Sequence, residues 1–278
     1  MLPVVLILIS AALHAAWNFA VRRHGDKLAA TALMVAGAVV LTFPLTLAFS
    51  AADWRQALPW GLCAGVGEAA YFVTLARALE IGPLAAVYTI SRGSSMLLVW
   101  PASHFLLGEV FGWRAITAVV LLLAGLVLLA PTDDRRSTSP AGYGWALACG
   151  LFIAIFQLIY KGAVSGGSGP PLIFLISMAT SLPIVVLSLG RGRSAALRSS
   201  LRAHPGLVAF GAVSMTVSFL IVLYVLRTHG AGWVMTLRNC SVAFAQILGW
   251  AVLRERPTVR AAAGVGLVLF DTLLLGTA

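Results

Sequence analysis

Charged residues are scarce in this chain. Of its 278 residues, 19 are Lys or Arg and 9 are Asp or Glu, so 10% of the sequence is charged and 60% is apolar. Roughly a quarter of an ordinary soluble domain is charged. This chain therefore has too little polar surface to cover a globule in water, and its mean hydropathy of +0.97 predicts an integral membrane protein.

The short alternating segments of a β-barrel are also lacking. Only helical bundles and closed barrels satisfy every backbone polar group in lipid. A barrel strand would alternate over about ten residues, whereas the apolar runs 115–130 and 207–226 reach helical length. The expected fold class is an all-α polytopic membrane protein.

Catalytic patterns are missing as well. The sequence has no HExxH, no GxSxG and no Asp-rich motif inside an apolar segment. Asp133 and Asp134 stand beside Arg135 and Arg136 in a hydrophilic stretch. An intramembrane enzyme, such as a lipid-modifying transferase, would need catalytic or metal-binding groups within the bundle. It remains the weaker alternative, and we expect no enzyme, no cofactor and no bound metal.

Cysteine usage and net charge exclude further classes. Cys63, Cys149 and Cys240 all fall in apolar segments, which favours buried thiols over a disulfide framework or a zinc site. The net charge of +10 comes from short connections between apolar runs, so it indicates membrane topology and not nucleic-acid binding. The first apolar run lacks the basic flank of a signal peptide and is expected to be retained as a helix.

Clusters of turn-forming and charged residues divide the chain into about ten segments of the length that a membrane span needs, about 20 residues. The expected spans are 2–21, 28–49, 57–79, 83–106, 112–130, 142–161, 170–189, 205–226, 232–253 and 259–275. The hydrophilic stretch 132–140 predicts a linker between a first five-helix repeat at 1–131 and a second at 141–278.

Polar residues recur at matching places in the two halves. The pairs separated by 146 positions are Arg92 with Arg238, Glu109 with Glu255, and Arg114 with Arg260. The pairs separated by 139 positions are Trp17 with Phe156, Asn18 with Gln157, and Arg22 with Lys161. An odd number of spans per repeat inverts one half relative to the other, an arrangement that places a substrate site near the bilayer midplane.

Basic residues gather on one side of the expected spans. The odd-numbered connections hold Arg22, Arg23, Lys27, Arg77, Arg135, Arg136, Arg191, Arg193, Arg198, Arg202, Arg254, Arg256 and Arg260. The side of the termini holds only Arg55, Arg114, Lys161 and Arg227. Because cytoplasmic connections are enriched in Lys and Arg, both termini are expected outside.

Three charges fall deep within spans. Glu68 has no charged neighbour between Arg55 and Arg77, while Arg92 and Arg238 occupy matching places in the fourth and ninth spans. Charges at bilayer depth are costly and mark functional sites. Glu68 is a candidate for proton coupling or for pairing with a cation, and the arginines are candidates for binding an anionic group. The alternative is structural: one Arg pairs with Glu68 and the other reaches the interface.

His14, Trp17 and Asn18 form a further candidate group on the first span. His14 and Asn18 are four residues apart and share a helix face, with Trp17 beside them. The group predicts part of a cavity lining, with His14 as a second candidate for proton coupling, although a hydrogen-bonded core histidine is the alternative. Tyr71 and Gln157 are weaker candidates of the same kind.

Other polar positions favour structural roles. Glu109 with Arg114, and Glu255 with Arg260, flank turns and are expected to form ion pairs at helix ends. Close helix packing is expected at Gly61, Gly65, Gly264 and Gly266. Asp271 faces either a neighbouring helix or a dimer partner.

The element His14-Ala15-Ala16-Trp17-Asn18, the Leu107-Gly108-Glu109 ending of the fourth span and the two five-helix repeats resemble the drug/metabolite transporter superfamily, specifically its EamA-type members. The resemblance implies a secondary carrier of the bacterial inner membrane that works by alternating access, often as an exporter. It also implies a central cavity lined by the first, third and fourth helices of each repeat. The second repeat departs from the pattern, with Arg254-Glu255-Arg256 for Leu-Gly-Glu and Gln157 for Asn18.

The expected function is secondary active transport of a small anionic or zwitterionic metabolite, such as an amino acid or organic acid, with possible proton coupling. An exporter of cationic drugs or quaternary amines that uses Glu68 is an alternative, and a scaffold or lipid scramblase is another. The expected partners are the small-molecule substrate and the lipid bilayer, with the chain acting as a monomer or homodimer. EamA-type proteins are described with cytoplasmic termini, against the charge distribution here; we keep the orientation that the charges predict.

Overall fold

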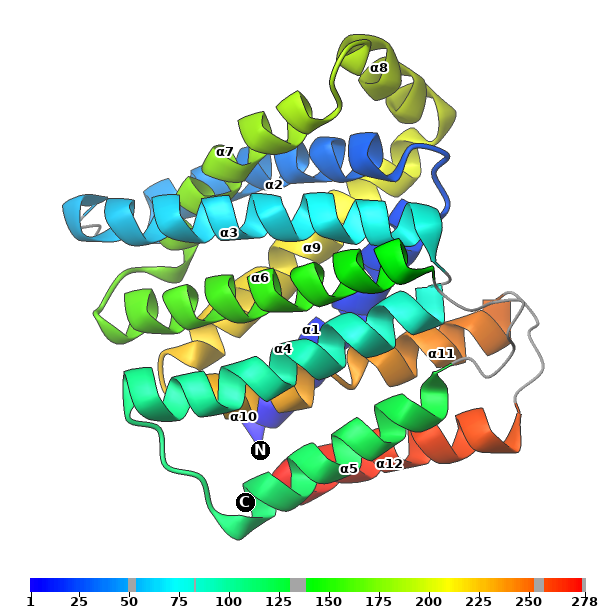
Figure 1. Ribbon diagram of the computed structural model, residues 1–278. Helices are drawn as coiled ribbons and strands as arrows, with labels where there is room; N and C mark the ends of the chain where they lie inside the picture. The colour runs from blue at the N-terminus through cyan, green and yellow to red at the C-terminus, as the bar shows by residue number, and fades with distance from the viewer. Residues whose placement is uncertain (50–53, 83, 131–138, 253–257, 277–278) are drawn as a thin grey trace.

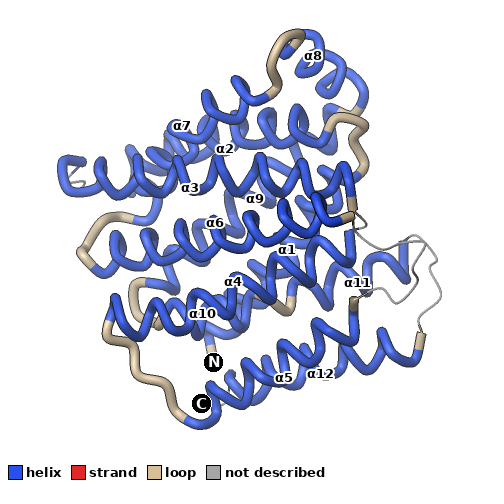
Figure 2. The backbone as a smooth tube through the Cα atoms, viewed as in Figure 1, coloured by secondary structure: helices blue, strands red, loops and turns tan. Residues whose placement is uncertain are grey.

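The computed structural model is helical throughout the residues that it describes, 1–49, 54–82, 84–130, 139–252 and 258–276 (Figure 1). No strand occurs in this part of the chain (Figure 2). In chain order the helices are α1 (Leu2–Arg22), α2 (Lys27–Phe49), α3 (Trp54–Ile81), α4 (Leu84–Leu107), α5 (Trp113–Leu129), α6 (Pro140–Ser165), α7 (Pro170–Ser188), α8 (Arg193–Ala203), α9 (Pro205–Leu226), α10 (Ala231–Arg238), α11 (Ser241–Val252) and α12 (Val259–Gly276).

Length and composition make this a polytopic membrane protein. Within the described residues, seven helices are long and apolar enough to cross a bilayer, namely α1, α2, α3, α6, α7, α9 and α12, and α5 is a shorter apolar helix. Large apolar side chains such as Val40, Leu47 and Phe105 are more than two thirds exposed on the outside of the bundle. Apolar surface of this kind suits contact with lipid. The predicted fold class is therefore confirmed.

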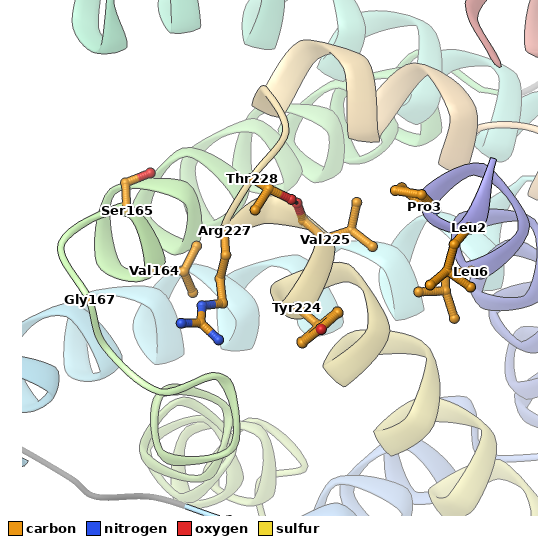
Figure 3. Close-up of a pocket in the computed structure, with 10 residues that line it drawn as sticks. All are labelled: Leu2, Pro3, Leu6, Val164, Ser165, Gly167, Tyr224, Val225, Arg227 and Thr228. Carbon is orange, nitrogen blue, oxygen red and sulfur yellow. Dashed lines mark hydrogen bonds between the residues drawn. The ribbon is translucent and has the colours of Figure 1, made fainter. Parts of the chain in front are cut away.

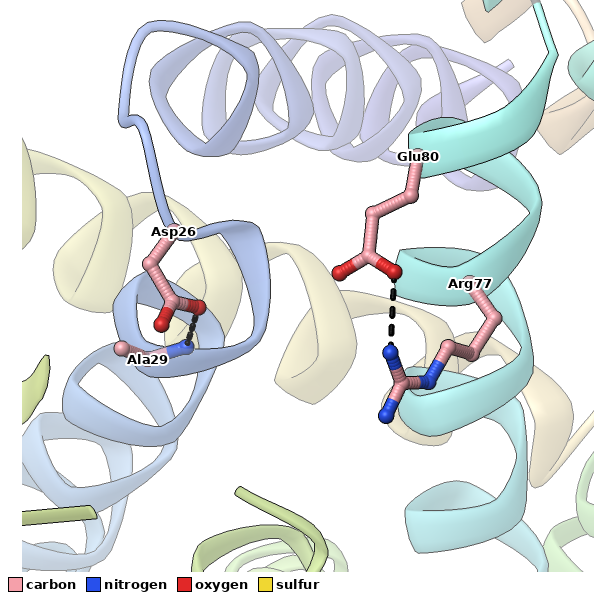
Figure 4. Close-up of polar contacts among 4 residues, drawn as sticks. All are labelled: Asp26, Ala29, Arg77 and Glu80. Atoms are coloured by element: carbon pink, nitrogen blue, oxygen red, sulfur yellow. Dashed lines mark hydrogen bonds and ion pairs between the residues drawn. The ribbon is translucent and has the colours of Figure 1, made fainter. Parts of the chain in front are cut away.

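Local sequence signals explain several helix starts. Proline occupies the first turn of α1, α6, α7 and α9, where its fixed φ suits a helix and its missing N–H costs nothing. Ser139 caps α6 by accepting a hydrogen bond from the Gly142 amide, 3.2 Å away. Asp26 does the same for α2, because its Oδ1 accepts from the Ala29 amide over 2.8 Å (Figure 4).

The predicted ninth span, 232–253, is wrong as a single helix. It is divided into α10 and α11 at Asn239 and Cys240. There the Cys240 amide bonds to the Leu237 carbonyl and the Val242 amide to the Asn239 carbonyl, each only three residues back. Hydropathy did not reveal this break, because apolar residues continue on both sides of a turn that contains neither glycine nor proline.

The short helix α8 was not predicted at all. It follows Gly192, whose φ of 88° lies in the left-handed region that glycine adopts most easily. Two contacts link its C-terminal end to the rest of the bundle. Ser200 Oγ lies 3.1 Å from Nδ1 of the buried His24, and the His204 ring packs edge-on to His24. Burial and then the neighbouring His204 lower the pKa of His24 below its ordinary value of 6.5.

The bundle has two chemically different ends. One carries both chain termini and the connections 107–113, 165–170 and 226–231, and we call it the terminal end (Figure 1). A Cβ on Gly276 would lie 3.2 Å from Val4, so the two termini are adjacent. The opposite end carries the connection 22–27 and α8, and we call it the basic end. Its described basic residues are Arg22, Arg23, Lys27, Arg77, Arg191, Arg193, Arg198, Arg202 and Arg260.

Helix packing is symmetric under exchange of the two halves. The contact of α3 with α6 is matched by that of α9 with α1, and the contact of α3 with α7 by that of α9 with α2. The contact of α4 with α6 is matched by the contacts of α10 and α11 with α1. The contacts α5–α12 and α2–α7 each join equivalent helices of the two halves, so exchange of the halves leaves them unchanged. This symmetry supports the organisation that we propose, with repeats at 1–131 and 141–278 related by an inversion. The predicted linker at 132–140 falls largely outside the described residues.

Close helix approach depends on three of the four expected glycines. A Cβ at Gly61 would lie 2.6 Å from Ile176 of α7, and one at Gly65 would lie 2.5 Å from Thr180 and 2.6 Å from the Ser177 carbonyl. A Cβ at Gly264 of α12 would lie 2.9 Å from the Gly125 carbonyl oxygen of α5. The expectation for Gly266 is wrong, because a Cβ there meets nothing within 4 Å.

Gly65→Ala is therefore expected to destabilise the protein, since the added methyl group overlaps backbone and side-chain atoms of α7. Overpacking of this kind costs about 1–3 kcal/mol. The matched control Gly266→Ala should leave stability unchanged or slightly raised, because alanine favours helix. Thermal unfolding in detergent measures both, and equal melting temperatures for the two variants would contradict the close contact between α3 and α7.

Candidate functional site

The eight side chains predicted from the sequence meet in the interior of the bundle. They come from α1, α3, α4, α6 and α10, and none is more than 6% exposed. They are His14, Trp17, Asn18, Glu68, Tyr71, Arg92, Gln157 and Arg238. Convergence of polar groups from both halves agrees with their expected location, whereas their role in binding stays a prediction.

His14 lies at the centre of this cluster. Its Nε2 contacts Nη2 of Arg92 from α4, and its Nδ1 lies 3.1 Å from Nη2 of Arg238 from α10. Trp17, one turn further along α1, donates its indole N–H to the same Nδ1 over 3.2 Å. One imidazole ring thus joins two guanidinium groups from opposite halves of the chain.

This arrangement is short of hydrogen-bond acceptors. An uncharged imidazole has one acceptor nitrogen, and a guanidinium group only donates. Because Nδ1 faces the donors of Trp17 and Arg238, an uncharged His14 carries its proton on Nε2, which faces another donor, Arg92. Nε of Arg238 is also buried, and it has no partner among the described residues. The centre is therefore chemically suited to a group that accepts hydrogen bonds and carries negative charge.

Glu68 lies near this centre but does not neutralise either arginine. Its Oε2 accepts a hydrogen bond from the Ser177 hydroxyl over 2.5 Å, and its Oε1 has no partner in the described part of the chain. Arg238 is close enough for an electrostatic interaction. Among the described residues, however, the ion pair within 4.0 Å is that of Arg77 with Glu80 (Figure 4). The alternative in which Glu68 serves as the direct partner of an intramembrane Arg is not supported.

Gln157 and Tyr160 are two further buried polar residues of α6. Both amide atoms of Gln157 lack a hydrogen-bond partner among the described residues. The two residues lie three positions apart on one face of α6, and Tyr160 interacts electrostatically with Glu68. In contrast, Asn18 donates its amide to the His14 carbonyl over 2.7 Å, within its own helix. Gln157 therefore has more free hydrogen-bonding capacity than Asn18.

Aromatic rings form the walls of the cluster. Phe219 of α9 lies under the Arg238 guanidinium, 4.6 Å from its centroid to the Arg238 Cζ, and stacks on Phe174 of α7. Tyr71 packs against Phe156 with centroids 5.5 Å apart. Ser177, Tyr160 and Phe219 also contact this cluster, and they are not among the candidate residues predicted from the sequence. Only Tyr160 had a signal, namely its helical spacing from Gln157.

Glu109 has a different role from the one expected. Its carboxylate accepts hydrogen bonds from the amides of Ala231 at 2.6 Å and Gly232 at 3.3 Å, at the start of α10. Arg114, its expected partner, lies over the Trp113 ring, with Cζ 5.6 Å from the centroid. The carboxylate thus caps the N-terminus of α10, where the positive end of the helix dipole favours an anion. This is the helix that carries Arg238 at its other end.

The second expected turn pair falls partly outside the described residues, which exclude Glu255. Its partner Arg260 donates to the Val127 carbonyl at the end of α5, over 2.7 Å. Asp271 is 1% exposed inside the chain and is close enough to Cys240 to interact with it, so it faces a neighbouring helix and not a dimer partner. Among the described residues, no group of three His, Cys, Asp or Glu side chains is placed to hold a metal ion.

The second half of the chain is similar in sequence to a known family. Residues 140–277 match the model of the EamA-like transporter family. The chain belongs to the EamA-type proteins of the drug/metabolite transporter superfamily. One solved crystal structure of a protein superposes with a TM-score of 0.78 and covers 98% of this chain and 95% of its own, at 16% identity. This EamA-type protein therefore has the same fold as that protein along both halves. No curated protein matches it.

Because Glu109 caps the helix that carries Arg238, Glu109→Ala is expected to destabilise this EamA-type protein by about 1–2 kcal/mol, the usual cost of losing a helix cap. Glu80→Ala is the matched control, since its exposed pair with Arg77 contributes about 0–1 kcal/mol. Thermal unfolding in detergent gives both values. A control that loses as much stability as Glu109→Ala would refute the cap.

Proposed function

We propose that this EamA-type protein is a secondary active transporter of a small anionic or zwitterionic metabolite, such as an amino acid or organic acid. Membership of the family supports transport of small solutes across a membrane. The observation that carries the finer proposal is the pair of buried arginines, Arg92 and Arg238, held on one imidazole without a carboxylate partner among the described residues.

Charge balance favours an anionic group. Two guanidinium groups and one carboxylate leave one net positive charge, even with Glu68 ionised and His14 uncharged. An isolated charge in a low-dielectric interior is costly. A substrate carboxylate provides both the missing charge and planar acceptors for the two arginines.

The polar groups on the other side of the cluster suit an amino group. Glu68 Oε1 and the Gln157 carbonyl are acceptors without a partner among the described residues, and the Tyr160 hydroxyl lies beside Glu68. An amino acid would thus direct its carboxylate to Arg92 and Arg238 and its ammonium group to Glu68. This division explains why a zwitterion is as well matched as an anion.

Proton coupling is assigned to Glu68, with His14 as the second candidate. A carboxyl group that is buried and not held in an ion pair is free to change charge when access alternates between the two sides. Export across a bacterial inner membrane, driven by alternating access of a monomer or homodimer, completes the proposal.

A cationic-drug exporter is the second candidate. The free oxygen of Glu68 and the rings of Tyr71, Phe156 and Phe219 favour it, because aromatic faces bind quaternary amines. The two arginines oppose it through like-charge repulsion. The lack of catalytic groups in the sequence disfavours an intramembrane enzyme.

The substrate class is tested by electrophysiology on proteoliposomes adsorbed to a solid-supported membrane. The panel holds amino acids, carboxylates, phosphonates and quaternary amines. Arg92→Ala and Arg238→Ala are each expected to reduce the current of an anionic or zwitterionic substrate ~10-fold or more, which corresponds to roughly 1.4 kcal/mol of lost binding.

The matched control is Arg77→Ala, which removes an exposed arginine at the basic end. Its currents should equal those of the wild type. Currents from quaternary amines alone, unaffected by either intramembrane substitution, would favour the cationic-drug exporter and overturn the assignment.

Glu68→Gln tests the coupling. The substitution keeps the acceptor for Ser177 but fixes the side chain as uncharged. Transport driven by a pH gradient is expected to fall ~10-fold or more, while exchange of internal for external substrate at equal pH continues. Proton-driven transport that survives in Glu68→Gln would exclude this residue as the coupling group and direct attention to His14.

A further inference from the structure

A recess opens at the terminal end of the bundle. It has a volume of about 620 Å³ and lies between α1, α6 and α9 (Figure 3). Leu6 of α1, Val164 and Ser165 of α6, and Tyr224, Arg227 and Thr228 at the end of α9 line it. We call it the vestibule. No acidic residue lines it.

The vestibule and the cluster are both lined by residues of α1 and α6. On α1, Leu6 lines the vestibule and His14, eight residues further, is the centre of the cluster. On α6, Gln157 and Val164 are seven residues apart. These separations correspond to about 10–12 Å along a helix. The vestibule lining thus lies about two helical turns from His14 and Gln157.

A reciprocal serine pair joins α1 to α9 between Leu6 and the cluster. Ser10 lies midway between Leu6 and His14, and its hydroxyl donates to the Ser218 carbonyl of α9 over 2.8 Å. The Ser218 hydroxyl donates to the Ser10 carbonyl, also over 2.8 Å. The two hydroxyl oxygens are 3.0 Å apart, and both residues are buried. These contacts hold α1 against α9 at the inner end of the vestibule.

The other wall of the vestibule is fastened differently. Lys161 of α6 donates to the carbonyls of Leu226 and His229, both over 2.9 Å, and so ties α6 to the end of α9. Side-chain hydrogen bonds between helices in a membrane are individually weak. A charged donor with two carbonyl acceptors is a stronger connection than hydroxyl pairs. Movement of α1 away from α9 is therefore the easier way to open the inner end.

Arg227 supplies the charge of the vestibule. Its side chain is exposed and makes no hydrogen bond or ion pair within the described residues. It also lines a neighbouring, mostly apolar cavity of about 510 Å³, together with Leu6 and Tyr224. A cation in a recess with apolar walls raises the local concentration of anions.

We propose that the vestibule is the mouth of the transport pathway at the terminal end, that Arg227 forms an outer binding site for the carboxylate of the substrate, and that the Ser10–Ser218 pair is the gate between this site and the buried arginines. The inference rests on the proposed function, because it takes the cluster as the inner substrate site. It adds a second anion site and names the contact that must break for substrate to pass.

Charge-selective thiol labelling tests the outer site without any substrate. Thr228→Cys is placed in a Cys63→Ser background, where the other native cysteines, Cys149 and Cys240, are buried. The reagents are an anionic and a cationic methanethiosulfonate, applied to spheroplasts and to inverted vesicles. Val110→Cys, exposed in the connection between α4 and α5, marks the side of the terminal end.

Thr228→Cys is expected to react from the side that labels Val110→Cys, and faster with the anionic reagent. Arg227→Gln should lower the ratio of anionic to cationic labelling rates about threefold, the size expected for one charge a few ångströms away in water. Arg55→Gln, which removes another arginine at the terminal end, should leave the ratio unchanged. A ratio that Arg227→Gln does not change overturns the outer site.

The gate is tested with a cysteine behind it. Gln157→Cys should react slowly from the terminal end, and at least about threefold faster once Ser10→Ala or Ser218→Ala removes part of the reciprocal pair. Two gate variants guard against a folding defect in one, which size-exclusion chromatography detects. Labelling that neither variant accelerates, or that occurs only from the basic end, refutes the gate.

Transport then separates this inference from the proposed function. With an anionic substrate, Arg227→Gln should raise the half-saturating concentration ~3-fold or more and leave the maximal current unchanged, whereas Arg55→Gln changes neither. If labelling behaves as expected and no anion gives a current in the wild type, the proposed function fails and the vestibule stands. Anion currents with unchanged labelling and half-saturation would leave the proposed function intact and overturn this inference.

Discussion

Burial of two arginines around one imidazole is the constraint on which the rest of the structure depends. A guanidinium group at bilayer depth costs about 2.5–3.5 kcal/mol or more, and here two are held within reach of His14. Their helices, α4 and α10, must therefore converge on α1 from opposite halves of the chain. Burial of apolar side chains elsewhere in the bundle offsets that free-energy cost. An apolar core of similar volume is often as stable or more stable, and this is one reason why we propose a role for the centre in substrate binding.

The break in the ninth span is connected to the same constraint. Arg238 is the last residue of α10, and a helix C-terminus is where its own dipole favours a cation. Glu109 holds the other end of this short helix from across the pseudo-symmetry axis, so α10 is fixed at both ends. Arg92 occupies the matching place in α4, which continues without interruption to Leu107. Both halves bring an arginine to the centre, but the helix continues past Arg92 and ends at Arg238.

The residues of the buried cluster were easier to predict from the sequence than the contacts between them, whereas their role in binding stays a prediction. Glu68, Arg92 and Arg238 were recognisable because a charge inside an apolar run is rare, and Gln157 because it repeats the place of Asn18. Ser177, Tyr160 and Phe219 carried no comparable signal, since serine and aromatic residues are common in helices and only tertiary packing selects those that reach the centre. Glu109 was recognised as structural but assigned to a sequence neighbour, whereas its partners lie 122 and 123 positions away. Hydropathy located the spans and overlooked α8 and the α10–α11 turn, because both depend on local hydrogen bonding.

Pseudo-symmetry relates the proposed gate to its counterpart in the other half. The contact of α1 with α9 corresponds to that of α3 with α6. The first is made by hydroxyl groups, Ser10 and Ser218; the second includes Gly67, where a Cβ would lie only 3.2 Å from the Phe156 Cβ. In an inverted repeat, exchange of conformations between halves would loosen one contact while tightening the other. The α3–α6 contact includes close packing at a glycine, whereas the α1–α9 contact includes hydrogen bonds between serines. Separating the two contacts therefore costs different free energies. In the mechanism that we propose, substrate bound at the inner site would contact α1, α4 and α10 together. It would shift this balance because a ligand moves a conformational equilibrium only through unequal binding to its two states.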